Sequence, residues 1–102
     1  MDEFLFKNFT ADESLRLRSD RALDRIVEMA PEDAVIHAVL EPDGQAFRCS
    51  IEIGSSTFPI TVQATHRLAA LAIDRAELMV RRKLGRWRGK NFLRFDRLNT
   101  SA

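Results

Sequence analysis

The sequence lacks the residue patterns that build disulfide frameworks, metal sites and phosphate-binding loops. Its single cysteine, Cys49, has no partner for an internal disulfide, which is typical of a protein in a reducing cytoplasm. There is no Cys-x-x-Cys pair and no Gly-rich phosphate loop, and His37 and His66 do not have metal-ligand spacing. No nucleophile with a nearby base is recognisable. We therefore predict a protein that is not an enzyme and that uses no cofactor or metal.

Long apolar runs are missing as well. No stretch of about 18 apolar residues occurs, so the sequence predicts no transmembrane helix and no membrane partner. Residues 1–10 are acidic ahead of a short apolar run, which is unlike a signal peptide. At 102 residues, with 45% hydrophobic and 30% charged residues, the chain has the size and composition of one globular domain. We expect that domain, a cytoplasmic one, to lie in residues 1–90.

Charge is distributed unevenly although the net charge is only +1. Residues 1–50 contain 6 Lys/Arg and 11 Asp/Glu, whereas residues 51–102 contain 10 Lys/Arg and 4 Asp/Glu. An asymmetry of this kind predicts a polyanionic partner for the second half. The first half would repel the same partner at close range.

A long amphipathic helix is predicted over residues 65–90, with Thr65 as its N-cap. Apolar residues at helical spacing form one narrow stripe: Ala69, Ala72, Ile73, Ala76, Val80, Leu84 and Trp87. Basic residues make the rest of this segment a candidate RNA-binding surface: Arg75, Arg81, Arg82, Lys83, Arg86, Arg88 and Lys90. A helix of this length could cover a whole sheet.

The basic end of this helix has two interpretations. The arginines could form a solvated face whose charges suit a helix C-terminus, or they could bind phosphate groups. Trp87 is interpreted as a core residue, with stacking on a nucleic-acid base as the alternative. Glu77, at the edge of the apolar stripe, is interpreted as the partner of Arg81 at i+4.

The first half of the chain predicts a strand followed by a helix. Residues 4–9 are rich in phenylalanine and are typical of a short strand. Thr10 as N-cap with Glu13 would form a capping box, and Asp12 is a competing cap. Pro31 ends the helix. Its apolar stripe is predicted to contain these residues: Leu15, Ala22, Leu23, Ile26, Val27 and Met29. Its mixed charges are interpreted as a solvated face.

Three further strands are predicted at residues 34–41, 45–53 and 57–64. The first is apolar on both faces, as in a central strand, and His37 on it is interpreted as making a local hydrogen bond. The segment Glu41-Pro42-Asp43-Gly44 predicts a turn with proline at its second position. Strict alternation predicts these inward-facing residues: Phe47, Cys49, Ile51, Ile53, Phe58, Ile60, Val62 and Ala64. Pro59 predicts an edge strand, because it lacks an N–H.

These elements predict an α+β fold with the order β-α-β-β-β-α. Each helix has one apolar stripe to bury, so both helices should cover one face of a four-stranded sheet in a two-layer sandwich. A right-handed crossover followed by a meander gives the strand order 1-2-3-4, with the first two strands parallel. Residues 91–102 form an apolar C-terminal tail, and we expect Phe92 and Phe95 to be at least half buried in the chain or against a neighbour.

The sequence resembles the ribosome hibernation-promoting factors, also called ribosome-associated inhibitors or sigma-54 modulation proteins, over residues 4–90. Asp12-Glu13-Ser14-Leu15-Arg16 is similar to the start of that family's first helix, and Ala72-Ile73-Asp74 matches an Ala-Ile-Asp step in its second helix. Leu84-Gly85-Arg86-Trp87-Arg88-Gly89-Lys90 is similar to its closing basic run. Where the family has Asp-Met-Tyr or Asp-Leu-Tyr, this sequence has Leu68-Ala69-Ala70.

This resemblance implies a short-form, stress-related regulator of translation. Such a protein would sit on the small ribosomal subunit near the mRNA and tRNA channel, and its basic second helix would meet 16S rRNA phosphates. The alternative is a protein-interaction module on the same fold, which would use the tail and the open sheet face to bind a protein partner or a second copy.

Overall fold

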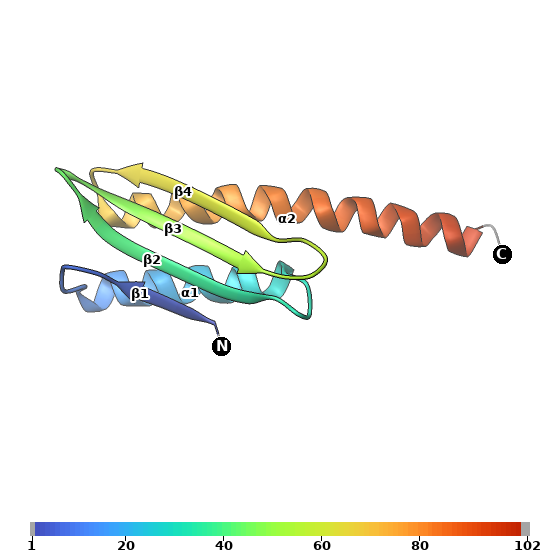
Figure 1. The fold of residues 1–102 in the computed structure, drawn as a ribbon, viewed down its shortest axis with the longest axis horizontal. Helices are drawn as coiled ribbons and strands as arrows, with labels where there is room; N and C mark the ends of the chain where they lie inside the picture. Colours follow the sequence, from blue (N-terminus) through green and yellow to red (C-terminus); the bar gives the residue numbers. More distant parts are fainter. Residues whose placement is uncertain (1, 101–102) are drawn as a thin grey trace.

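Four strands and two helices follow one another in the predicted order β-α-β-β-β-α (Figure 1). This computed structural model describes the backbone of residues 2–100 and the side chains of residues 2–89. The elements have these bounds: β1 (Glu3–Phe6), α1 (Glu13–Met29), β2 (Val35–Asp43), β3 (Ala46–Gly54), β4 (Ile60–His66) and α2 (Ala69–Thr100).

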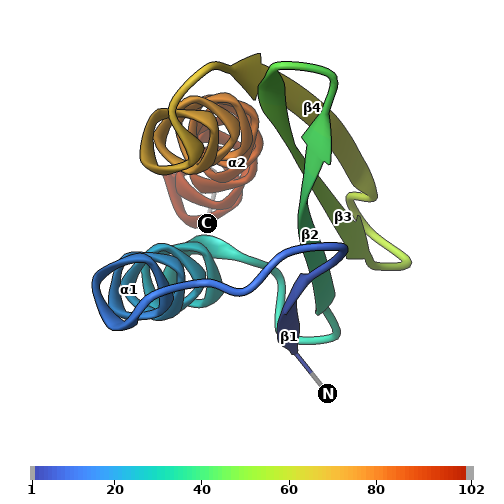
Figure 2. The ribbon, with the colours of Figure 1, turned by 90° about the vertical axis from the view of Figure 1, so that its left-hand side faces the viewer.

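The sheet has the predicted strand order β1-β2-β3-β4. Strand β1 is parallel to β2, and the other two pairs are antiparallel. Figure 2 shows both helices on the same side of the sheet, so the predicted two-layer arrangement is confirmed. The two helices run in the same direction, because each follows a strand that ends at the same end of the molecule (Figure 1).

The core lies between the sheet and the two helices. Strands β2 and β3 bury three cross-strand pairs on their inner face: Ile36–Ile53, Ala38–Ile51 and Leu40–Cys49. The predicted alternation of β3 is therefore confirmed, and Cys49 is a packing residue. Burial raises the pKa of the Cys49 thiol to about 12, so this thiol stays protonated and unreactive near neutral pH.

The apolar stripe of α2 completes the core. Its inner positions are fully buried, with an exposed fraction of 0%: Ala72, Ile73, Ala76, Val80 and Leu84. Ala69 and Trp87, at the two ends of the predicted stripe, are partly buried and pack against the same core. The stripe therefore fixes which side of α2 faces solvent along more than four helical turns.

Helix α1 begins later than a Thr10 cap would place it. Asp12 is the N-cap, and its Oδ1 accepts a hydrogen bond from the Leu15 N–H at 2.8 Å. The competing cap is thus the correct one.

Strand β1 ends at Phe6, short of the predicted residue 9, and Asn8 has a positive φ of 63°. Val27 was predicted in the apolar stripe but is 45% exposed, which is a correction to that stripe.

The β2–β3 turn differs from the predicted one. Pro42 pairs with Phe47 and Asp43 pairs with Ala46, so only two residues connect the strands. Gly44 takes φ 64° at the first of these positions, as type II′ hairpins require. Proline is tolerated inside β2 because β1 pairs only as far as Leu40, so the outer edge of β2 is uncovered at Pro42.

Strand β4 is longer than predicted at its end, and α2 begins later. Thr65 lies in β4, so the prediction that it caps the helix is wrong. Instead, the Leu68 carbonyl accepts the first helical hydrogen bonds, and His66 Nδ1 accepts the Leu68 N–H at 2.9 Å. Strand β4 is an edge strand, as Pro59 predicted.

Helix α2 extends past the sheet. Its 32 residues correspond to a length of about 48 Å, and the molecule is 56 Å long in its largest dimension. Figure 1 shows its last turns beyond the end of the strands. The helix crosses residue 90, where the sequence was divided into domain and tail. The predicted burial of Phe92 and Phe95 concerns side chains outside the described residues, and the division stays a prediction.

Candidate nucleic-acid interface

Polar contacts connect the two helices along their length. Arg18 of α1 donates from Nη1 to Asp74 Oδ2 at 2.6 Å, and Arg25 donates to Glu77 through two bonds of 2.7 Å. Farther along, Arg88 Nη1 donates to the Glu28 carbonyl oxygen at 3.2 Å. These contacts fix the rotation of each helix relative to the other, and they determine which basic side chains remain unpaired.

Glu77 is the buried centre of this contact line. Its side chain is only 7% exposed, and the Arg25 guanidinium donates one hydrogen bond to each carboxylate oxygen in a bidentate pair. The hydrogen bond to Glu77 raises the pKa of Arg25. Arg81, the predicted partner, lies 3.5 Å from Glu77 Oε2 and is the weaker of the two contacts. Glu77 is therefore held in a structural ion pair between the two helices.

Six of the seven basic residues predicted as the RNA site have described side chains, and these six fall into two groups. Arg81 contacts Glu77 of its own helix at 3.5 Å, and Arg88 donates to the Glu28 carbonyl of α1 at 3.2 Å. Lys90 has its side chain outside the described residues. The remaining four are exposed, and none has an ion-pair partner among the described side chains: Arg75, Arg82, Lys83 and Arg86. We call these four the free basic row.

The free basic row lies on the side of α2 away from α1. Arg82 and Arg86 are one turn apart, and both lie far around the helix from the buried Val80 and Leu84. Arg75 begins the row, where its Nη1 lies 3.4 Å from the Thr65 carbonyl of β4. The row is therefore presented by a helix whose opposite side is locked in the core.

Helix α1 adds arginines that sequence analysis had assigned to a solvated face. A hollow of about 280 Å³ lies between the helices, and three arginines of α1 line it: Arg18, Arg21 and Arg25. Ser14, Leu17 and Asp74 complete its lining. We call it the interhelical hollow. Arg18 and Arg25 are paired, whereas Arg21 is exposed and has no ion-pair partner within the described part of the chain. The spacing 18, 21, 25 already placed these residues on one helix side.

Trp87 lies where α2 leaves the sheet. Its ring stacks on Phe58 of the β3–β4 connection, with centroids 5.9 Å apart and an interplanar angle of 15°. Both rings are partly buried against the core. The interpretation of Trp87 as a core residue is therefore confirmed, because one ring face is already occupied by Phe58.

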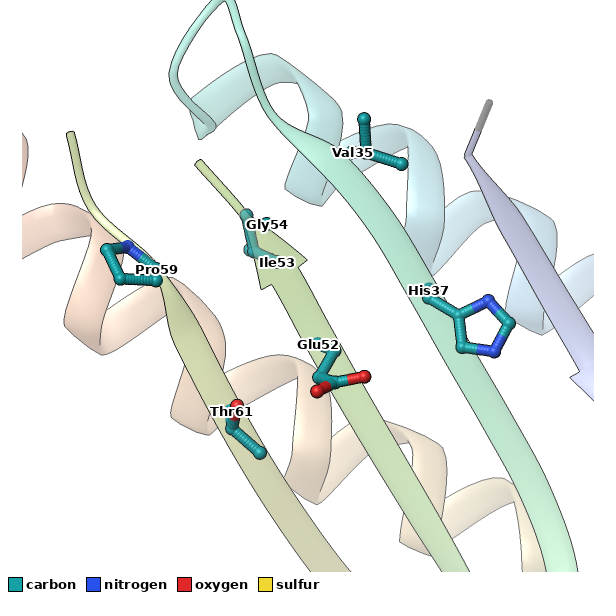
Figure 3. A pocket seen from close by; sticks show the side chains of 7 residues that line it. All are labelled: Val35, His37, Glu52, Ile53, Gly54, Pro59 and Thr61. Carbon is teal, nitrogen blue, oxygen red and sulfur yellow. The ribbon is translucent and has the colours of Figure 1, made fainter. Parts of the chain in front are cut away.

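The open face of the sheet has a different character. A hollow of about 360 Å³ lies over β2, β3 and β4. Figure 3 shows His37, Glu52 and Thr61 among the side chains that line it. His37 Nδ1 lies 2.8 Å from Glu3 Oε1 of the neighbouring strand β1, where the two residues are cross-strand partners. The predicted local hydrogen bond of His37 stays a prediction. Within residues 2–89 no group of three potential metal-ligating side chains gathers.

The open face carries basic side chains too, but Arg48 there is paired with Glu41 at 2.7 Å, and Glu3 and Glu52 add negative charge. The free basic row lies on the helix layer, so the helix layer is the candidate nucleic-acid interface.

Comparison with known proteins shows which solved structures share this fold. No protein-family model matches the sequence, and no curated protein matches it. Among solved structures, the N-terminal domain of Protein Y from Thermus thermophilus superposes with a TM-score of 0.70 at 20% identity, covering 83% of this chain and 94% of that one. A ribosomal subunit interface protein from Coxiella burnetii also gives 0.70, at 11% identity, covering 86% and 97%. The described chain therefore has the fold of these two proteins.

The same described part of the chain contains no helix that is both long enough and apolar enough to cross a bilayer. Helix α2 has the length, but its charged residues recur through every turn beyond Asp74. This pattern is that of a helix lying on a core with one side in water.

Proposed function

We propose that this protein associates with the ribosome as a translation inhibitor of the hibernation-factor type, and that it binds small-subunit rRNA through its helix layer. The observation that carries the proposal is the free basic row: Arg75, Arg82, Lys83 and Arg86 are exposed, and none has an ion-pair partner among the described side chains, on a helix that the core holds in place. The two structural neighbours, one of them named as a ribosomal subunit interface protein, support the choice of the ribosome.

Phosphate recognition suits these side chains. A guanidinium can place two N–H groups on one phosphate, whereas the Lys83 ammonium acts as a point charge. Such contacts hold a protein in register on RNA without reading its sequence. The protein would therefore bind a particular rRNA shape, near the channel for mRNA and tRNA, and would inhibit translation by occupying that space.

No chemical step belongs to this function. Inhibition by occupancy needs affinity, a fixed orientation and a rigid body, and the contacts Arg25–Glu77 and Arg18–Asp74 provide the last two. We therefore propose a binding protein without catalytic activity.

A pelleting titration against 30S subunits tests the proposal. We expect the Arg82→Gln/Arg86→Gln variant to bind roughly tenfold or more weakly, and its salt dependence to flatten by about two units in the logarithmic slope. The control is Lys7→Gln/Arg48→Gln, which removes the same formal charge from the open sheet face, where Arg48 is paired with Glu41 at 2.7 Å, and it should bind 30S subunits as wild type does. Equal binding by wild type and the α2 variant across salt concentrations would end the rRNA proposal.

A protein-interaction module on the same fold is the second candidate. The hollow on the open sheet face favours it, because Val35 there is 50% exposed beside His37 and Glu52. In that case the Lys7→Gln/Arg48→Gln control and substitutions at Val35 would change partner binding, and 30S subunits would not bind the wild type.

A further inference from the structure

The outer edge of strand β4 presents backbone groups that have no partner in the sheet. Two residues connect β2 and β3, so Asp43 and Ala46 form the closing hydrogen-bonded pair of that hairpin. Every second residue of β3 from Ala46 onward therefore bonds β2, and the residues between them bond β4. Three residues of β4 then direct their N–H and C=O groups away from the sheet: Thr61, Gln63 and Thr65.

The two edges of the sheet are protected to different degrees. Strand β1 has four residues, contains Glu3 and is flanked by Asp2 and Lys7. Strand β4 has seven residues and contains no lysine, arginine, aspartate or glutamate. Charged residues, proline and short length are the usual means by which an edge strand avoids pairing with another chain. Pro59 lies just before β4, so the strand itself has none of these means and its edge can accept a further strand.

Helix α2 borders this edge. Figure 2 shows α2 beneath the β4 side of the sheet and α1 beneath the β1 side. Arg75 Nη1 lies 3.4 Å from the Thr65 carbonyl oxygen, and within residues 2–89 this is the single hydrogen bond to an outward group of β4. Trp87 stacks on Phe58 just before β4, so the strand and the helix run in opposite directions between these two contacts. Three arginines at intervals of seven and four residues share one side of α2: Arg75, Arg82 and Arg86. The Arg75 contact shows that this side borders the β4 edge.

The backbone groups of β4 select an extended peptide as the occupant. Outward N–H and C=O groups recur along the strand, and another extended backbone supplies acceptors and donors at the same spacing. An rRNA phosphate accepts hydrogen bonds but donates none, so it would leave the carbonyl oxygens of Thr61 and Gln63 without a donor. Side chains on one face of the added strand would lie beside Arg75 and Arg82. Acidic side chains suit those positions because they complement the arginines.

A second copy of this chain is a poor occupant of the edge. If β4 paired with β4 of a second copy, the two α2 helices would lie next to each other beneath one continuous sheet. Each helix would then present Arg75, Arg82 and Arg86 to the same residues of the other. Like charges facing each other across an interface are strongly unfavourable. The added strand must therefore come from a different, acidic segment.

We propose that the β4 edge binds an acidic, extended segment of another protein by strand addition. The segment would hydrogen-bond to Thr61, Gln63 and Thr65 and would place its carboxylates beside Arg75 and Arg82. The same arginines cannot then meet rRNA phosphates, so the segment and rRNA exclude each other. A protein with such a segment would release this protein from the ribosome. The strand contact is independent of the proposed function, and the competition with rRNA rests on it.

Hydrogen exchange measured by nuclear magnetic resonance tests the strand contact. The probe is a synthetic peptide that alternates glutamate and valine over about eight residues, which is long enough to span β4. In the free protein, the amides of Thr61 and Gln63 should exchange quickly, and those of Val62 and Ala64, which bond β3, should exchange slowly. We expect saturating peptide to slow exchange at Thr61 and Gln63 by roughly tenfold or more. Unchanged exchange at these two amides overturns the inference.

Two N-methylated peptides separate strand pairing from charge attraction. One is methylated on its valine nitrogens and the other on its glutamate nitrogens, so the two carry the same charge. In an added strand, N–H groups of only one of these sets point toward β4. We therefore expect one methylated peptide to bind roughly tenfold more weakly than the other. Equal binding would mean that charge alone holds the peptide, and it overturns the inference.

A substitution in β4 tests the same contact from the side of the protein. Gln63→Pro removes one outward N–H at an edge position, where proline is tolerated. We expect it to weaken binding of the unmethylated peptide by roughly fivefold or more. The matched control Gln63→Thr keeps the N–H and should bind as wild type does. Equal peptide binding by the two variants overturns the inference. If Gln63→Pro does not fold, the comparison of the two methylated peptides decides.

A competition experiment on 30S subunits tests the regulatory step. The unmethylated peptide should release the protein from 30S subunits in a pelleting assay, and the more weakly binding methylated peptide should not. Peptide binding without release overturns the competition with rRNA. A wild-type dimer in sedimentation equilibrium that Gln63→Pro dissociates overturns the inference in favour of a second copy. If the wild type does not bind 30S subunits, the proposed function and the competition fail together, and the exchange measurement still decides the strand contact.

Discussion

The two helices lie side by side on one sheet face, yet they use their arginines differently. On α1, Arg18 and Arg25 are tied to the carboxylates of Asp74 and Glu77 on α2. On α2, Arg82 and Arg86 are exposed with no ion-pair partner among the described side chains. The number of basic residues is thus a poor guide to a binding surface. What matters is which of them the opposite helix has already paired.

The largest expected effect comes from loosening the helix that carries the free basic row. Leu84 is fully buried near the point where α2 leaves the sheet, so Leu84→Ala should lower the free energy of unfolding by about 2–5 kcal/mol. Val27→Ala on α1, where the side chain is 45% exposed, should change it by less than about 0.5 kcal/mol. Urea denaturation of both variants measures the difference. Similar losses would contradict the burial of Leu84 and the exposure of Val27.

The second prediction compares the paired arginines of α1 with the unpaired arginines of α2. Arg18→Gln/Arg25→Gln should leave the salt slope of 30S binding nearly unchanged, whereas Arg82→Gln/Arg86→Gln should flatten it by about two units. The physical reason is that arginines already paired with Asp74 and Glu77 release few counterions from RNA. Pelleting at several salt concentrations measures both slopes. Equal flattening of the salt slope by the two variants would show that the arginines of α1 contact RNA despite their ion pairs with α2.

A third prediction weakens the pairing itself. Glu77→Gln keeps the shape of the buried side chain and removes its charge, so it should cost about 1–3 kcal/mol of unfolding free energy. Arg25 is 43% exposed and can return to water, which holds the loss toward the lower end. The double variant Arg25→Gln/Glu77→Gln closes a double-mutant cycle. A coupling energy near zero would mean that the forked pair orients the helices without stabilising them.

The smallest expected effect comes from a substitution at Asp33. Asp33, just after α1, accepts hydrogen bonds from Ser56 and Ser55, and these lower its pKa to about 2. Because the folded pKa is below the ordinary value of 3.8, this stabilisation is present above about pH 4 and is lost as the pH falls toward 2. Asp33→Asn should therefore lower the thermal midpoint slightly at pH 6 and not at all near pH 2. A pH-independent difference would point to lost shape complementarity instead of lost charge.

Local pattern was enough to predict most of the fold. The apolar stripe from Ala72 to Leu84 and the alternation of Cys49, Ile51 and Ile53 both follow from geometry within one element, so periodicity identifies them. The start of α2 was misplaced for the same reason. Thr65 is a good cap by type, but its pairing with Arg48 keeps it in β4, and that pairing is a tertiary fact.

The candidate site was less predictable, because its selection depends on contacts between distant residues. Arg25 and Glu77 are 52 residues apart in sequence, so no local spacing shows that they form a forked pair. From the sequence alone Arg81 and Arg82 look equivalent, although Arg81 contacts Glu77 and Arg82 has no ion-pair partner among the described side chains. Helical spacing alone shows that the three arginines lining the interhelical hollow share one side of α1. It does not show that this side faces α2.

The stacked pair of Phe58 and Trp87 has a practical consequence. The chain contains a single tryptophan, and it sits where α2 leaves the sheet. Its fluorescence therefore comes from one site, without labelling. A shift in its emission on adding 30S subunits would report that the junction between the anchored and the projecting parts of α2 changes its surroundings. An unchanged spectrum would mean that the helix is engaged as a rigid rod.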